Sequence, residues 1–108
     1  MKHARELIVE ELRKNKTLRL VHLQDAILSL FSGEKRVGLL MLRDIVNATC
    51  GFPKLAKTLS LPDKSVQRML SVVGNPTTDN LMAIVRFIFT QENVEEIKLK
   101  RASHKKAA

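Results

Sequence analysis

Residues 51–71 constrain the fold more than any other part of the chain, because two short amphipathic patterns lie there on either side of a turn. In the first pattern, apolar residues recur at the i, i+3, i+4 and i+7 spacing of one helical face: Phe52, Leu55, Ala56 and Leu59. A second pattern with the same spacing begins near Asp63: Val66, Met69, Leu70 and Val73. Two helices this short, joined by only a few residues, predict a helix-turn-helix.

The second predicted helix carries polar side chains opposite its apolar stripe: Lys64, Gln67, Arg68 and Ser71. A short helix that buries one face and presents such side chains on the other is suited to reading base edges and contacting phosphates in a DNA major groove. A solvated surface helix is the alternative interpretation of this pattern. The matching helix that precedes it favours the DNA-binding interpretation.

Further motifs flank the two helices. They are Arg-Met-Leu-Ser at residues 68–71, Gly-Asn-Pro-Thr at 74–77 and Asp-Asn-Leu at 79–81, together with residues 42–46, 51–52, 55–57 and 64–67. With these motifs, the chain from about residue 39 to residue 89 resembles the Cro-type (Xre-family) helix-turn-helix regulators, and within them the HigA-like addiction-module antidote (antitoxin) branch. The resemblance implies an all-α, lambda-repressor-like bundle of five to six helices.

The resemblance also implies a function, namely that of an antitoxin that binds a RelE/ParE-like toxin and represses the operon encoding both proteins. The residues independently favour a transcriptional regulator that binds duplex DNA. One short reading helix discriminates only a few bases, so we expect a homodimer that contacts two half-sites about one helical turn apart. The apolar first two predicted helices and the C-terminal tail are alternative surfaces for the toxin.

Nine residues are the candidate DNA contacts: Lys54, Lys57, Asp63, Lys64, Ser65, Gln67, Arg68, Ser71 and Asn75. Arg68 is the candidate for bidentate contact with guanine, and Gln67 for contact with adenine. Lys54 and Lys57, on the supporting helix, are expected to meet phosphates and to contribute salt-sensitive affinity without sequence choice. In the resembled family, the turn that contains Asn75 often approaches the phosphate backbone.

Three residues depart from the family pattern. Ser60 stands where the family commonly has a glycine, and a left-handed backbone at a serine costs about 1 kcal/mol. Pro62 replaces the usual Ser or Thr cap, so Asp63 is expected either to act as the cap or to occupy the first helical position. There its carboxylate would repel a phosphate or accept from a cytosine amino group. These residues favour the alternative function: a helix-turn-helix-derived protein-interaction module with little or no specific DNA binding.

The sequence predicts one domain in three segments: an N-terminal helical extension (1–33), the helix-turn-helix region (34–90) and a basic C-terminal tail (91–108). Helices are expected over residues 5–14, 18–31 and 34–49, with Thr17 capping the second and Gly51 ending the third. A last helix follows Thr77 or Thr78 as cap.

The expected buried faces follow helical spacing. The first helix buries Leu7, Ile8 and Leu12, and the second buries Leu20, Leu23, Ile27 and Leu30 or Phe31. The third buries Leu39, Leu42, Ile45 and Val46, with Arg36, Arg43 and Asp44 outside, and the last buries Leu81, Ile84, Val85 and Ile88.

The second predicted helix is apolar nearly all round, since Leu18, Val21 and Leu28 widen its stripe. Such a helix must be covered on most sides, either by its own domain or by a second subunit or another protein. His22, within this stretch, is expected to have a structural role.

The alternation of Ile97 and Leu99 with lysines over residues 95–101 predicts a short strand, which would pair with a copy of itself or with a partner's sheet edge. The alternative is a helix that continues from residue 92 to residue 106. Residues 102–108 are expected to be disordered.

The net charge of +8 is concentrated in two places: residues 51–75 hold 4 basic against 1 acidic residue, and residues 98–108 hold 5 against none. This distribution favours a polyanionic partner, although a lysine-rich tail is equally often only solvated. The absence of Trp and Tyr disfavours stacking on single-stranded nucleic acid.

Other classes of function find little support. No apolar run is long enough to span a membrane and no export signal is evident, so a cytoplasmic location is expected. Cys50 has no nearby His or second Cys, so we expect no metal and no cofactor. No catalytic constellation is present, so an enzyme is the weakest of the three hypotheses.

Overall fold

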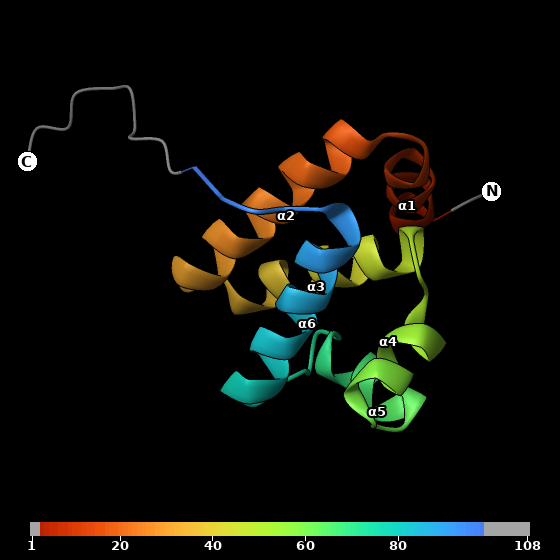
Figure 1. Cartoon of the computed structure of the whole chain (residues 1–108), viewed down its shortest axis with the longest axis vertical. Helices are drawn as coiled ribbons and strands as arrows, with labels where there is room; N and C mark the ends of the chain where they lie inside the picture. The colour runs from red at the N-terminus through yellow and green to blue at the C-terminus, as the bar shows by residue number, and fades with distance from the viewer. Residues whose placement is uncertain (1–2, 99–108) are drawn as a thin grey trace, which may run out of the picture.

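The computed structural model describes residues 3–98, which form six α-helices and no strand (Figure 1). The helices are α1 Ala4–Lys14, α2 Lys16–Phe31, α3 Lys35–Ala48, α4 Phe52–Leu59, α5 Asp63–Met69 and α6 Thr78–Glu92. The prediction of an all-α helical bundle is therefore confirmed. Among residues 3–98, no helix has the length and apolar character needed to cross a bilayer.

Local side-chain caps set several helix boundaries. The amide of Leu18 donates to Asn15 Oδ1 at 2.9 Å, which begins α2 directly after α1. The prediction that Thr17 caps this helix is wrong, because Asn15 performs that role two residues earlier. Thr77 caps α6 as predicted, with its hydroxyl oxygen accepting from the amide of Asn80 at 3.1 Å.

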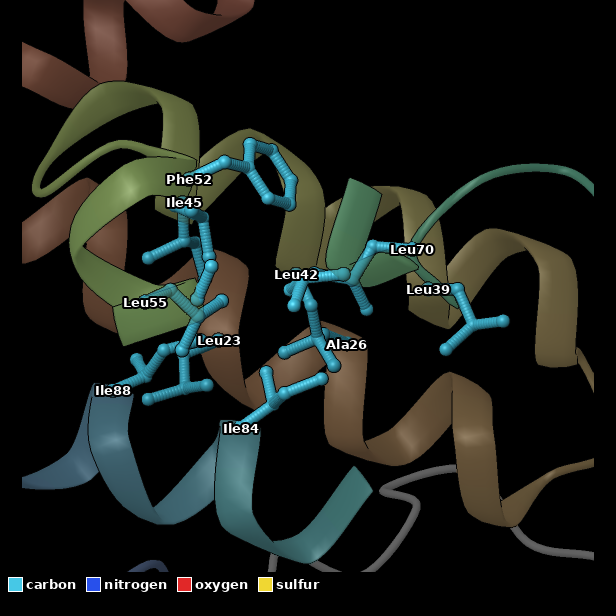
Figure 2. Close-up of a cluster of buried hydrophobic side chains, with 13 residues drawn as sticks. Leu23, Ala26, Leu39, Leu42, Ile45, Phe52, Leu55, Leu70, Ile84 and Ile88 are labelled. Atoms are coloured by element: carbon cyan, nitrogen blue, oxygen red, sulfur yellow. The ribbon is translucent and has the colours of Figure 1, made fainter. Parts of the chain in front are cut away.

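Helix α3 lies at the centre of a single hydrophobic core, and helices α2 and α4 to α6 pack around it (Figure 2). All four residues predicted to be buried on α3 are buried: Leu39, Leu42, Ile45 and Val46. Helix α2 contributes Leu23 and Ala26 to this same core, and α6 contributes Ile84 and Ile88. The N-terminal extension is thus built into the core of the helix-turn-helix region.

The close packing of α2 on α3 depends on small side chains. A Cβ atom at Gly38 would lie 2.6 Å from Leu30 Cγ and 3.0 Å from the carbonyl oxygen of Ala26. Ala26 itself is fully buried. The two helices approach each other closely because neither residue projects far into their interface.

Helix α2 buries a narrower face than its sequence predicts. Leu23 is buried and Ile27 and Leu30 are half-buried, but Leu20 is 37% exposed and Phe31 is 88% exposed. On α1, Leu12 is buried whereas Leu7 is half exposed. The prediction is therefore wrong at Leu7 and Leu20, whereas of the predicted alternatives Leu30 and Phe31 it is Leu30 that packs. On α2, α3 covers only one side of the helix, and the described chain leaves the other apolar side open to solvent.

Asp44 is a further correction, because its side chain points into the protein and is 1% exposed. Helix α1 packs against this face of α3 and brings Arg5 Nη2 to 3.0 Å from Asp44 Oδ2. His22 Nε2, on α2, lies 3.1 Å from the same oxygen. A buried carboxylate requires such partners, so the cluster ties α1 and α2 to α3.

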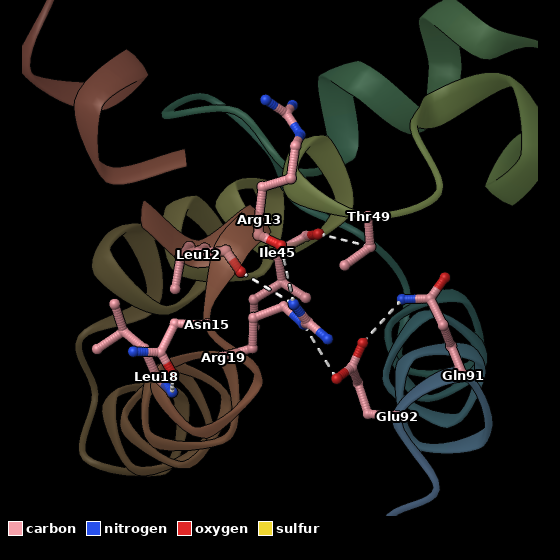
Figure 3. Close-up of polar contacts among 9 residues, drawn as sticks. All are labelled: Leu12, Arg13, Asn15, Leu18, Arg19, Ile45, Thr49, Gln91 and Glu92. Atoms are coloured by element: carbon pink, nitrogen blue, oxygen red, sulfur yellow. Dashed lines mark hydrogen bonds and ion pairs between the residues drawn. The ribbon is translucent and has the colours of Figure 1, made fainter. Parts of the chain in front are cut away.

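A second polar cluster connects α2 with α6 (Figure 3). Arg19 Nε donates to Glu92 Oε1 at 3.0 Å, and Arg19 Nη1 donates to the carbonyl oxygen of Leu12 at 3.0 Å. Glu92 is buried at the last turn of α6. The arginine therefore holds the ends of α1 and α6 against the start of α2.

Helix α6 ends at Glu92, and Asn93 adopts a left-handed backbone with φ 57°. The following residues, 94–98, are irregular and lie against α2, where Gln24 Nε2 donates to the carbonyl oxygen of Lys98 at 3.2 Å. The predicted strand is therefore wrong over residues 95–98, and so is the alternative of a continuing helix. This segment packs against helix side chains and finds no strand edge. Residues 99–108 lie outside the described part of the chain.

Candidate nucleic-acid interface

The turn between α4 and α5 has the left-handed residue that the family resemblance implies. Ser60 is left-handed, with φ 58° and ψ 43°. Its amide donates to the carbonyl oxygen of Lys57 at 3.2 Å, and the amide of Leu61 donates to the carbonyl oxygen of Ala56 at 3.0 Å. This pair of bonds satisfies the last carbonyls of α4 and sets the direction in which the chain enters α5.

Helix α5 begins without a side-chain cap. Pro62 precedes it with an extended backbone, and its carbonyl oxygen accepts from the amide of Ser65 at 3.0 Å. Asp63 occupies the first helical position and is exposed. Of the two predicted roles, Asp63 therefore takes the second, in which its charge interacts favourably with the helix dipole.

One face of α5 is anchored in the core. Val66 and Leu70 are fully buried and Met69 is half-buried, in agreement with the predicted stripe. Val73, however, is 67% exposed, so the stripe is one residue shorter than predicted. The reason is that α5 ends at Met69 and the chain turns away before the next helical position is reached.

The opposite face of α5 is open to solvent where the sequence predicts contact with DNA. Lys64 and Arg68 are exposed, and Ser65 and Gln67 are half-buried. On the supporting helix α4, Lys54 and Lys57 are also exposed. The structure thus presents four exposed cations on α4 and α5, with the exposed Asp63 carboxylate on the same pair of helices.

Ser71 is not part of this face. It lies beyond the end of α5, where its hydroxyl donates to the carbonyl oxygen of Arg68 at 2.7 Å and accepts from the amide of Val73 at 3.3 Å. Both bonds belong to the turn that follows the helix. The prediction that Ser71 shares a helical face with Lys64 is therefore wrong, although the residue remains close to Arg68 in the chain.

Asn75 is exposed in the next turn, and Lys35 holds its side chain. The Lys35 ammonium donates to Asn75 Oδ1 at 3.1 Å. Lys35 is the first residue of α3. Forty positions separate the two residues, so no local sequence pattern indicates the contact.

Arg43 supports α5 from α3, although helical spacing predicts that this residue lies outside. Its Nη1 donates to the carbonyl oxygens of Gln67 at 2.9 Å and Leu70 at 3.5 Å. Its guanidinium also lies 5.2 Å from the centroid of the Phe52 ring on α4. Carbonyls at a helix C-terminus lack intrahelical partners and favour a cation, so Arg43 fixes the end of α5 relative to α3 and α4.

The backbone at Gly74 crosses close to the end of α5. A Cβ atom at this position would lie 2.1 Å from the carbonyl oxygen of Met69 and 2.8 Å from that of Arg68. Both atoms belong to the backbone of the last turn of α5. Glycine is therefore required here by the closeness of the two chain segments.

Cys50 lies half-buried between α3 and α4. Burial raises the pKa of its thiol, which donates to the carbonyl oxygen of Gly51 at 3.2 Å. Over residues 3–98, no three His, Cys, Asp or Glu side chains gather as a metal site would require. The arrangement around Cys50 is that of a packed side chain.

The fold and the interface together define the class of architecture: an all-α protein with a helix-turn-helix formed by α4 and α5, whose second helix has a buried apolar face and an exposed basic face. No protein-family model, curated protein or solved structure matches the chain. The function is therefore inferred from the geometry of this interface and from the resemblance in sequence motifs.

Proposed function

We propose that the protein is a sequence-specific, duplex-DNA-binding transcriptional regulator. The observation that supports this most directly is the exposure of Arg68 and Lys64 on a short helix whose other face is anchored by Val66 and Leu70. A helix held in this way can enter a major groove without losing its packing.

In this proposal, α5 reads bases and α4 positions the protein. Arg68 contacts guanine through its two-pronged guanidinium, and Gln67 contacts adenine. Lys54 and Lys57 on α4 meet phosphates, and each contact of this kind makes binding weaker as salt rises. The turn at Asn75, held by Lys35, approaches the backbone beside them.

The protein acts on DNA as a homodimer in this proposal. Seven residues of α5 reach few base pairs, so a single copy discriminates poorly between sites. Two copies related by a two-fold axis would contact half-sites about 34 Å apart, which is one turn of the duplex.

The motif resemblance supports a more specific role, that of a cytoplasmic antitoxin that binds a RelE/ParE-like toxin and represses the operon encoding both. The exposed apolar side of α2 offers a surface for such a protein. Co-expression with the product of the adjacent reading frame tests this role. A stable complex that binds the upstream DNA is expected, whereas failure of any neighbouring product to associate contradicts it.

A gel-shift titration of the full chain against its own upstream DNA, at two salt concentrations, tests DNA binding. We expect a sequence-specific shift whose affinity falls as the salt concentration rises. Arg68→Ala should weaken the free energy of DNA binding by about 1–3 kcal/mol. Arg86→Ala is the matched control, because Arg86 is an exposed arginine on α6, outside α4 and α5.

The alternative is a helix-turn-helix-derived protein-interaction module. Pro62 leaves α5 without a side-chain cap, and Asp63 places an exposed carboxylate at its start, where phosphates would approach. A folded protein that produces no shift at any concentration would establish this alternative and overturn the regulator.

A further inference from the structure

Helices α2 and α6 enclose an apolar groove with a volume of about 520 Å³. Its walls are Ile27 and Leu30 on α2 and Leu81, Val85 and Phe89 on α6. In Figure 1, the segment after α6 runs back along α2, and Ile97 of this segment also lines the groove. The walls of the groove are thus apolar along both helices.

Two large apolar side chains stand at the groove and face solvent. Phe31 is 88% exposed and Met82 is 65% exposed. Exposed apolar surface that is continuous over two helices is typical of a binding site. Leu81, Val85 and Phe89 recur every four residues along α6, and paired helices with such rows accept the apolar face of a third helix.

The charges at the groove have a single sign. Among the described residues that line it, only Lys35 and Arg86 are charged, and both are cations. The ammonium of Lys35 has three donors, so its bond to Asn75 leaves donors for a carboxylate. A second copy of the chain that docked with the same face would bring the same two cations, Lys35 and Arg86, against each other. Charge complementarity therefore favours an acidic occupant.

We propose that this groove binds an acidic amphipathic helix of a partner protein. The apolar stripe of that helix packs between α2 and α6, against Phe31 and Met82, and its carboxylates pair with Lys35 and Arg86. None of the groove residues belongs to α4 or α5. Lys35 is shared with the proposed DNA interface, because it also holds Asn75, so the groove is tested in the absence of DNA.

The test uses the full chain and two synthetic amphipathic helices that share one leucine stripe and differ only in carrying glutamate or lysine at the other positions. Fluorescence anisotropy titrations at low and high salt give the Kd of each helix. We expect the glutamate helix to bind at least about tenfold more tightly than the lysine helix, with a difference that shrinks as salt screens the pairs.

Two matched variants locate the binding. Met82→Asp places a carboxylate at the groove and should weaken binding of the glutamate helix about tenfold. Val73→Asp adds the same charge at a valine that is 67% exposed and outside the groove, and should leave binding unchanged. Because both residues are exposed, both variants should fold, which circular dichroism checks. Arg86→Glu should remove most of the preference for the glutamate helix, because the remaining cation, Lys35, is then offset by the new carboxylate.

Several results would overturn the proposal. One is equal affinity of the protein for the two helices, and another is no measurable binding of either helix. A third is that Met82→Asp binds the glutamate helix as tightly as Val73→Asp does. Self-association in sedimentation experiments that Met82→Asp abolishes, without binding of the glutamate helix, would assign the groove to a second copy of the chain and would equally overturn it.

Discussion

Ser60 and Arg43 shape the helix-turn-helix although neither is a candidate DNA contact. Ser60 adopts a left-handed backbone that glycine would adopt more easily. Arg43 reaches from α3 to the carbonyls at the end of α5. Both residues affect the orientation of α5, the first through the turn that precedes the helix and the second through its C-terminus.

Replacing Ser60 by glycine should stabilise the protein by about 1 kcal/mol, because glycine lacks the Cβ that disfavours a left-handed backbone. Urea unfolding of the purified protein measures the change. Asn93→Gly is the control, since Asn93 has a similar φ of 57° but asparagine tolerates it better, so its gain should be smaller. A Ser60→Gly variant that is no more stable than the wild type contradicts the prediction.

Arg43→Met should lower the free energy of unfolding by about 1.5–3 kcal/mol, because hydrogen bonds from a charged donor are lost and carbonyls are left unpaired. It should also weaken specific DNA binding, since the end of α5 is no longer held. Arg43→Lys should show an intermediate loss, because it keeps the charge without the planar fork. If unfolding and gel-shift measurements of Arg43→Met match those of the exposed Arg86→Met, Arg43 does not position α5.

The elements of this fold are held in place by contacts at their ends. Asn15 joins α1 to α2, Thr77 begins α6, and Arg19 brings the last turn of α6 to the start of α2 (Figure 3). Helix α5 has no cap of its own, so its position depends on the core beneath it and on the turn at Gly74. The position of α5 is therefore most sensitive to changes in the turn that follows it.

Gly74→Ala should destabilise the protein by about 1–3 kcal/mol, because the new Cβ would meet backbone atoms of α5 that cannot rotate away. The displacement should weaken specific DNA binding more than nonspecific binding, which gel shifts against operator and random duplexes compare. Val73→Ala is the control, as it changes an exposed neighbour. Equal losses for both duplexes would indicate destabilisation without displacement of α5.

The whole chain shares one core, and its N-terminal helix is attached to that core through charge. Asp44 is buried between Arg5 of α1 and His22 of α2, at 3.0 and 3.1 Å. Removing one partner of a buried ion pair leaves a charge without compensation, whereas replacing both by apolar groups is often neutral. The attachment of α1 can therefore be tested by single and double substitution.

Arg5→Leu should lower the free energy of unfolding by about 1–3 kcal/mol, since it leaves the buried Asp44 carboxylate dependent on His22, while the 40% exposure of the Arg5 side chain moderates the loss. The double variant with Asp44→Leu should lose less than Arg5→Leu alone. Urea denaturation of the wild type, the two single variants and the double variant gives the four free energies of unfolding of a double-mutant cycle. A double variant less stable than Arg5→Leu would show that the cluster contributes net stability as an ion pair.

Helical periodicity predicted most of the fold correctly, because it reports which residues share a face. The buried residues of α3 and α6 and the outward direction of Arg68 follow from local spacing. The left-handed backbone of Ser60 was instead implied by the resemblance, in which a glycine commonly occupies this position. Helical spacing gave the wrong exposure for Asp44 and Val73, and the alternation of apolar and basic residues gave the wrong structure for residues 95–98. At each of these, the outcome depends on a distant segment or on where a helix stops.

The candidate interface was predicted in part for the same reason. The exposed lysines of α4 and α5 belong to single helices and were predictable, but the roles of Arg43 and Lys35 depend on residues 24 and 40 positions away. Amphipathic spacing within the chain thus determined which helices form and which faces they bury, since those preferences are local. Packing determined which apolar residues stay exposed, which charges are buried and what holds α5 in place, because these depend on contacts between helices that are distant in the sequence.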